Sequence, residues 1–236
     1  HGSKGGVASQ PAIRLDNPDD QAYGRFGYSV AWAGDVNGDG YADLVAGAPN
    51  QEDGGTDEKE EGNAFVYLGS ESGVATQPAI LLDNPDDQAY GSFGRSVASA
   101  GDVNGDGYAD LVVGAPHQEY GGTDETLEGN AFVYHGSING VATEPTTRLD
   151  NPDDQAGGYF GRSVASAGDV NGDGYADLVV GAPSQKYGDT NEEYEGNAFI
   201  YHGSESGVAT VPGIRLDNPD DQAGGWFGYS VAWARK

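Results

Sequence analysis

An acidic loop with oxygen-bearing side chains at alternate positions recurs three times along the chain. In the second copy, positions 1, 3, 5, 7 and 9 are Asp102, Asn104, Asp106, Tyr108 and Asp110. A tightly wound loop turns such oxygens inward, position 7 contributes its backbone carbonyl, and Ca²⁺ takes about six to eight oxygen ligands. The set contains no His or Cys, which disfavours zinc and copper. These residues therefore predict a calcium site.

The first and third copies carry the same five residues at the same spacing. They are Asp35, Asn37, Asp39, Tyr41 and Asp43 in the first copy, and Asp169, Asn171, Asp173, Tyr175 and Asp177 in the third. Three carboxylates this close together repel one another strongly in a low-dielectric surrounding unless a cation is bound. The alternative is an Asx-turn, in which Asp and Asn side chains bond only to their own backbone. We expect three Ca²⁺ sites, one in each copy.

These loops belong to a repeat of fixed length. The landmark LDNPDDQA begins at residues 15, 82, 149 and 216, a step of 67 residues each time without insertion or deletion. A fixed period of this size indicates a repeat architecture. Each unit contains four short β-like segments bounded by Gly, Pro, Asn or Asp, and none has the length and period of a helix. In the second unit they are residues 93–100, 111–115, 130–134 and about 141–149.

Four strands per unit predict an all-β propeller of four-stranded blades, with the acidic loop between the first and second strands. A β-sandwich is the alternative, but a sandwich does not require an unbroken period. We expect a single domain over residues 1–236. Its three full repeats are residues 26–92, 93–159 and 160–226.

The two ends of the chain hold incomplete units. Residues 1–25 should supply a lone outer strand over residues 7–15 and a link, and residues 227–236 a lone inner strand over residues 227–234. Three blades do not close a ring with ordinary blade geometry, and an open array exposes sheet edges. We therefore expect a homo-dimer in which the terminal strands join two arcs into one ring.

Composition excludes several classes of partner. The formal net charge is −27, from 38 acidic and 11 basic residues, which argues against nucleic acid and against an anionic membrane surface. No apolar run approaches the roughly 20 residues that span a bilayer, so no membrane insertion is expected. The paired carboxylates recur in all four LDNPDDQA turns, and His135 and His202 occupy the same repeat position, whereas an enzyme needs one irregular site. We predict that the protein is not an enzyme, with a glycan-cleaving role as the enzymatic alternative.

Two sets of positions break the repeat. Tyr28 and Trp32 in the first unit are Arg and Ser in the next two units, and the aromatic pair returns as Tyr229 and Trp233. This pattern reflects sequence drift, or the four residues mark an interface where the two ends meet another chain or each other. One residue before Phe-Gly, the third unit ends in Trp226 and the second in Tyr159. An aromatic ring there would stack on a sugar or pack on the next blade.

The repeated Phe-Gly and Gly-Ala-Pro motifs are those for which the FG-GAP family is named. They are Phe26-Gly27 with Gly47-Ala48-Pro49, Phe93-Gly94 with Gly114-Ala115-Pro116, and Phe160-Gly161 with Gly181-Ala182-Pro183. The chain resembles the integrin α-subunit β-propeller and related bacterial and fungal propellers over nearly its whole length. The resemblance implies four-stranded blades, commonly seven, and Ca²⁺ held between the first and second strands. This chain departs from that pattern because it holds three complete units.

The resemblance also sets the functional expectation. It implies a non-catalytic, calcium-binding scaffold for adhesion or recognition of a protein or glycan ligand, outside the cell or at its surface. One alternative is a lectin with glycan pockets between blades. The other is a designed or excised repeat fragment with no natural ligand. The near identity of the copies favours recent duplication or deliberate construction.

Overall fold

The structure is a computed structural model, with side chains described from residue 13 onward. The described residues are 2–3, 6–7, 13–52, 59–119, 126–186, 194–220 and 222–233. Within these ranges every regular element is a β-strand, and no helix is present that is long and apolar enough to cross a membrane. The prediction of an all-β protein is confirmed.

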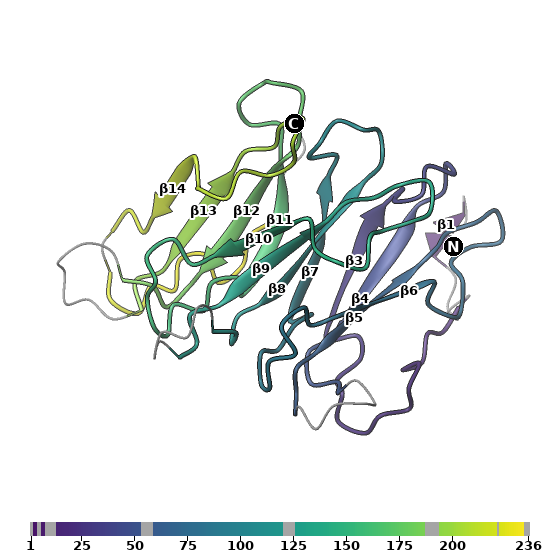
Figure 1. The fold of residues 1–236 in the computed structure, drawn as a ribbon, viewed down its shortest axis with the longest axis horizontal. Coiled ribbons are helices and arrows are strands. Elements are labelled where there is room, and N and C mark those ends of the chain that lie inside the picture. Colours follow the sequence, from purple (N-terminus) through teal and green to yellow (C-terminus); the bar gives the residue numbers. More distant parts are fainter. Residues whose placement is uncertain are drawn as a thin grey trace.

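Three antiparallel sheets of four strands follow one another along the chain, and each sheet keeps its strands in sequence order (Figure 1). The first sheet contains β3 (Ser29–Gly34), β4 (Asp43–Ala48), β5 (Asn63–Tyr67) and β6 (Ile80–Asp83). The second contains β7 (Ser96–Gly101), β8 (Asp110–Ala115), β9 (Asn130–Tyr134) and β10 (Thr147–Asp150). The third contains β11 (Ser163–Gly168), β12 (Asp177–Ala182), β13 (Asn197–Tyr201) and β14 (Ile214–Asp217).

The sheets stack face to face, and their first strands lie closest together, with β3 against β7 and β7 against β11. This is the arrangement of propeller blades around an axis. Both faces of the middle sheet are covered, so β8 and β9 are buried along their whole lengths. The core is apolar and aromatic; Phe93, for example, packs on Phe132 with ring centroids 5.7 Å apart.

Close approach of neighbouring blades depends on small residues at the first two strands. A Cβ on Gly47 would lie 2.0 Å from the carbonyl oxygen of Gly94, so only glycine fits there. Beside it, the hydroxyl of Ser29 donates a hydrogen bond to the same carbonyl at 2.8 Å. The arrangement repeats one unit later, where Ser96 donates to the carbonyl of Gly161 at 2.8 Å. Each junction between blades is therefore built in the same way.

The two lone terminal strands differ from expectation. Near the N-terminus, β1 (Gly2–Ser3) pairs with β2 (Gly6–Val7), residues 13–15 are not in a strand, and residues 8–12 lie outside the described residues. Residues 227–233 form no ladder; Phe227 alone makes an isolated bridge, with Gly196, and residue 234 is not described. A first strand pairs with the second strand of its own sheet, as β11 does with β12. In the described part of the chain no such second strand lies beside residues 227–233.

The outer faces of the first and third sheets are covered only in part: Leu15 and Phe26 pack on the first, and Phe227 and Val231 pack on the third. Val30 is 57% exposed, whereas Val97, at the same place in the second sheet, is 7% exposed. On the other side, Leu216 is 39% exposed, whereas the equivalent Leu149 is fully buried. The described sheets therefore form an arc whose two end faces keep exposed apolar surface around Val30 and Leu216.

This difference gives a stability test with an internal control. Val97→Ala should lower the free energy of unfolding by about 2 kcal/mol, because it removes two buried methyl groups and leaves a cavity. Val30→Ala should cost less than about 0.5 kcal/mol, as exposed substitutions usually do. Urea denaturation at low protein concentration measures both. Equal losses at the two positions would show that the face of the first sheet is covered.

Candidate functional site

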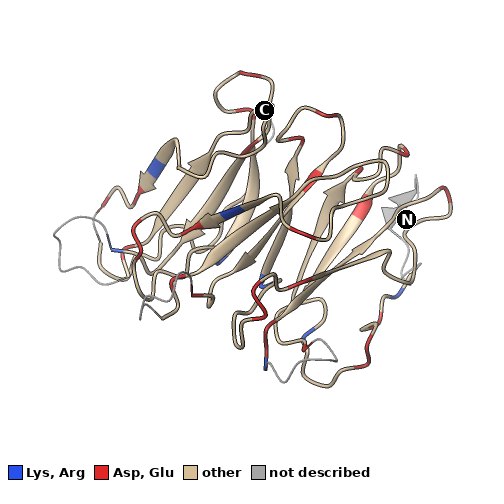
Figure 2. Ribbon diagram, in the orientation of Figure 1, with Lys and Arg blue, Asp and Glu red and all other residues tan. Residues whose placement is uncertain are grey.

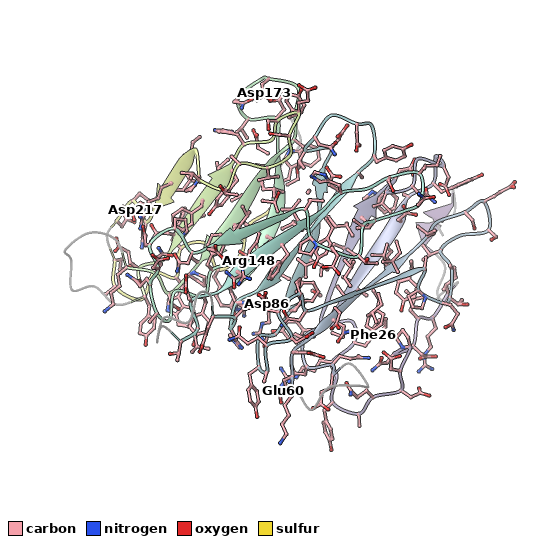
Figure 3. The ribbon with its side chains drawn as sticks, in the orientation of Figure 1. Phe26, Glu60, Asp86, Arg148, Asp173 and Asp217 are labelled. Atoms are coloured by element: carbon pink, nitrogen blue, oxygen red, sulfur yellow. The ribbon has the colours of Figure 1, made fainter. Side chains whose placement is uncertain are left out.

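Each acidic loop joins the first strand of a sheet to the second, as predicted. The second loop begins at a β-bulge, where the register between β7 and β8 shifts between Ser99 and Gly101. Gly101 has φ +82°, a backbone conformation that favours glycine. The bulge ends the ladder and turns the chain into the loop. Figure 3 shows Asp173 of the third loop at one end of the molecule, and Phe26, which precedes the first strand, near the other.

Side-chain oxygens wind the loop. In the second copy, the two carboxylate oxygens of Asp102 accept hydrogen bonds from the backbone N–H of Asp106 at 3.1 Å and of Gly107 at 2.9 Å. Asn104 Oδ1 also accepts from the N–H of Asp106, at 2.9 Å, and Asp106 Oδ1 accepts from the N–H of Tyr108, at 3.0 Å. The first and third loops repeat all four bonds. Positions 1, 3 and 5 therefore turn their oxygens into the loop.

The third acidic ligand candidate has a different environment. Asp110, at position 9, is fully buried; one oxygen accepts from the N–H of Val103 at 2.8 Å and the other from the N–H of Gly136 at 2.9 Å. Burial raises the pKa of Asp110 to about 7, and the nearby carboxylates of Asp106 and Asp102 also raise it. The two hydrogen bonds act in the opposite direction and lower the pKa. Asp43 and Asp177 make the equivalent pair of bonds. Burial likewise raises the pKa of Asp43.

The loops also fasten neighbouring blades to one another. The N–H of Ala109, in the second loop, donates to the carbonyl of Asp35 in the first loop at 3.0 Å. The ring of Tyr108 lies over Gly38, where a Cβ would come within 2.7 Å of it. Position 7 therefore carries a side chain that packs on the preceding loop. The second and third loops are joined in the same way, with the N–H of Ala176 donating to the carbonyl of Asp102 at 2.9 Å.

These residues fit a hard divalent cation by the chemistry of their donors. A carboxylate offers about four lone-pair sites, so an oxygen that accepts one N–H still has room for a cation. No Lys or Arg of the described chain pairs with Asp102, Asp106 or Asp110. In the described ranges, however, no three His, Asp or Glu side chains are gathered into a cluster that could hold a metal. The bonds seen are those of the Asx-turn alternative, and the calcium assignment stays a prediction.

The aromatic residues singled out at the two ends are all partly exposed. Trp32 and Trp233 line one apolar groove of about 680 Å³ along the first strands. The indole of Trp233 covers Gly168, where a Cβ would lie 2.6 Å from its Nε1. Tyr28 and Tyr229 lie elsewhere, each facing an arginine of the next or preceding unit. Their role as an interface stays a prediction.

A second cleft, of about 570 Å³, collects residues that lie far apart in the sequence. It contains Tyr159 and Trp226, the two stacking candidates, together with Arg95 and Arg162. In the sequence, both arginines stand out only because they replace the tyrosine that the first unit has at position 28. One sequence feature links the two kinds of residue: each arginine directly follows a Phe-Gly pair, and each aromatic residue directly precedes one. Only the stacking of the blades shows that these positions meet.

Comparison with known proteins agrees with this geometry. The family model for the FG-GAP repeat matches residues 26–58, 93–124 and 160–201, which fall in the three four-stranded units. The chain is an FG-GAP repeat protein. It is 39% identical to mouse integrin alpha-IIb over 176 residues, which is 73% of this chain and 16% of the relative. It is 35% identical to Xenopus laevis integrin alpha-5 over 202 residues, or 84% of this chain and 18% of the relative.

Human integrin alpha-6 is also similar, with 37% identity over 159 residues, or 67% of this chain and 12% of the relative. The FG-GAP chain thus spans less than a fifth of the length of these three relatives. With the three matched repeats and the three stacked sheets, the similarity supports the propeller architecture.

The buried aspartate predicts a pH dependence in the presence of a chelator. The pKa of Asp110 is raised from its ordinary 3.8 to about 7, so between these values the folded protein holds a proton that the unfolded chain has lost. This contribution to stability is fully present below pH of about 4 and is lost as the pH rises through about 7. Asp110→Asn should flatten that decline in urea denaturation, because Asn does not titrate.

The control is Asp16→Asn, which changes an exposed carboxylate outside the loops. This variant should keep the full decline. If Asp110→Asn also keeps it, the buried carboxyl group is not its source.

Proposed function

We propose that this protein is a non-catalytic, calcium-binding propeller scaffold for adhesion or ligand recognition, working outside the cell or at its surface. The main observation behind this proposal is that the three acidic loops lie at the blade junctions, where hydrogen bonds between loops join one blade to the next. Similarity to integrin α subunits supports the adhesive role and the extracellular setting.

The residues that would hold calcium come from positions 1, 3, 5, 7 and 9 of each loop. They are Asp35, Asn37, Asp39, Tyr41 and Asp43; Asp102, Asn104, Asp106, Tyr108 and Asp110; and Asp169, Asn171, Asp173, Tyr175 and Asp177. A bound Ca²⁺ supplies positive charge that offsets the repulsion among the loop's carboxylates. The loops then stay wound, and the hydrogen bonds between neighbouring loops are kept.

The contacts of the titratable residues support a role without catalysis. Asp110 is held by two backbone N–H groups, and His202 lies 3.2 Å from the carboxylate of Asp177 in the same structural position of its unit. His117 contacts the hydroxyl of Ser92 at 3.0 Å and packs edge-on against Tyr159. Each contact positions a strand or a loop, and none pairs a nucleophile with a base and a third orienting group.

Calcium should be needed for full stability. At 100 times its dissociation constant, a bound ligand stabilises the folded state by about 2.7 kcal/mol, so excess chelator should lower the melting temperature clearly. Asp106→Ala should reduce bound calcium from three ions to two, measured by atomic emission after dialysis, because it removes the position 5 ligand of one loop only. Asp16→Ala should keep three. An unchanged melt in chelator, together with calcium-free purified protein, would contradict the proposal.

We also propose that two copies associate through their ends. Residues 26–33 and 227–234 are the same octapeptide, FGYSVAWA. At the C-terminal end, the carbonyl of Gly228 accepts from the hydroxyl of Ser163 at 2.8 Å, which is the bond made at both junctions between blades. Residues 227–233 therefore lie where the first strand of a fourth blade would lie, and a second copy would have to supply the strands that complete it, because none in the described part of the chain does. The exposed apolar surface around Val30 and Leu216 supports such an association.

Analytical ultracentrifugation tests this association. The intact chain should sediment with twice the monomer mass at micromolar concentration, and deletion of residues 227–236 should leave a monomer. Trp32→Ser and Trp233→Ser, which introduce the residue of the middle units, should weaken the dimer, while Arg14→Gln at an exposed site should not. A compact monomer of the intact chain would contradict the proposal.

A further inference from the structure

The cleft between the second and third blades has the size and position of a binding site. Its volume of about 570 Å³ falls within the usual range for small-ligand pockets, about 300–1,000 Å³. Arg95 and Arg162 each stand one residue before a first strand, β7 or β11, at the end of the sheets opposite the acidic loops. Figure 2 shows how unusual a basic pair is in this molecule, because acidic residues dominate its loops.

These two arginines lack the acidic partners that three other arginines have. Arg14, Arg148 and Arg215 each form an ion pair with an aspartate. In the described part of the chain, neither Arg95 nor Arg162 does. Their contacts are with aromatic rings. Arg95 lies 4.6 Å from the ring centre of Tyr28, and Arg162 lies 4.5 Å from that of Tyr229 and donates to its hydroxyl at 2.7 Å. In addition, Arg95 Nε is buried without a hydrogen-bond partner.

Among the described residues that line the cleft, Arg95, Arg162 and His117 are basic and none is Asp or Glu. Burial lowers the pKa of Arg95, and the nearby guanidinium of Arg162 lowers it further. Burial also lowers the pKa of His117, with Arg95 and Arg162 adding to the effect, although Glu60 opposes it. An oxyanion placed between the two guanidinium groups would relieve this repulsion and satisfy donors that the protein leaves open.

Four aromatic side chains, Tyr159, Tyr194, Trp226 and Tyr229, also line the cleft. Tyr159 and Trp226 sit one residue before Phe-Gly with φ +54° and +53°, and Arg25 and Ser92 adopt the same conformation in the other units. The backbone therefore requires a left-handed residue there but does not select an aromatic one. The ring of Trp226 stacks on the ring of Tyr194, with their centroids 5.9 Å apart, and Trp226 remains 46% exposed. The rings offer apolar surface beside the charged groups.

We propose that this cleft binds an acidic sugar, with its carboxylate between Arg95 and Arg162 and its ring against Tyr159 and Trp226. The proposal rests on the recognition role proposed above and names the ligand class for it. Net charge does not prevent this binding. At physiological ionic strength the Debye length is about 8 Å, so the two guanidinium groups in contact outweigh distant carboxylates for a sugar that carries one carboxylate on each acidic ring.

The test uses the full chain in calcium and a tetrasaccharide of alternating glucuronate and N-acetylglucosamine. Binding is measured by titration calorimetry and by tryptophan fluorescence, to which Trp226 should contribute. Arg95→Gln and Arg162→Gln should each weaken binding about tenfold or more, because each removes a charge-assisted hydrogen bond. Trp226→Ala should weaken it about threefold or more. The matched control, Arg14→Gln, loses the same charge outside the cleft and should leave affinity unchanged.

Uncharged N-acetylglucosamine tetrasaccharide should bind at least about tenfold more weakly than the acidic one. Arg162→Lys keeps the positive charge but loses the planar guanidinium group, which can bind a carboxylate through two donors. This variant should also bind the sugar weakly, and it provides the test if Arg162→Gln does not fold. The proposal is overturned if the acidic tetrasaccharide does not bind at millimolar concentration, or if Arg95→Gln and Arg14→Gln bind it equally. Tighter binding of an acidic peptide, hexaglutamate, would also overturn the ligand class. Calcium stoichiometry is measured alongside, so that failure of the unmodified chain to bind the sugar while it holds three ions counts against the cleft and not against the proposed scaffold.

Discussion

The buried carboxylate at the start of each second strand holds the rest of each blade in place. Asp110 joins three segments, because it begins β8 and accepts hydrogen bonds from the acidic loop and from the turn after β9. A buried charged group is costly unless its hydrogen bonds are satisfied, so both backbone N–H groups must stay in position. This requirement fixes where the acidic loop leaves the sheet. The loop in turn determines how the next blade is fastened.

Much of the fold follows from the sequence because the repeat gives the same information three times. The third strand, residues 130–134, was predicted with the bounds that β9 has, since it is a continuous apolar run between glycines and turn residues. The fourth strand was predicted too early, at about residue 141, whereas β10 begins at Thr147. The preceding residues 141–146 contain both apolar and turn-forming types, and local pattern does not separate them. Residues 227–233 have the sequence of a first strand but not the neighbour that would pair with it.

The candidate sites differ in how far sequence alone reaches them. The acidic loop is local, so nine consecutive residues contain all its donors and their order predicts their placement. The arginine cleft is not local. Arg95 and Trp226 are far apart in the chain, and their proximity depends on one blade stacking on the next. Copy-to-copy differences pointed to these positions, but only the packed structure shows that they share one space.

The coupling between loops also gives the array a direction. The first and second loops are each overlaid by the loop of the following unit, and Val36 and Val103 are fully buried there. The third loop has no such cover among the described residues, and its equivalent Val170 is 48% exposed. When each unit contacts only its neighbours, stability spreads by nearest-neighbour coupling, and units with fewer neighbours open first. Local unfolding of the loops should therefore start at the third loop, which no other loop covers. It should then spread to the second loop and finally to the first.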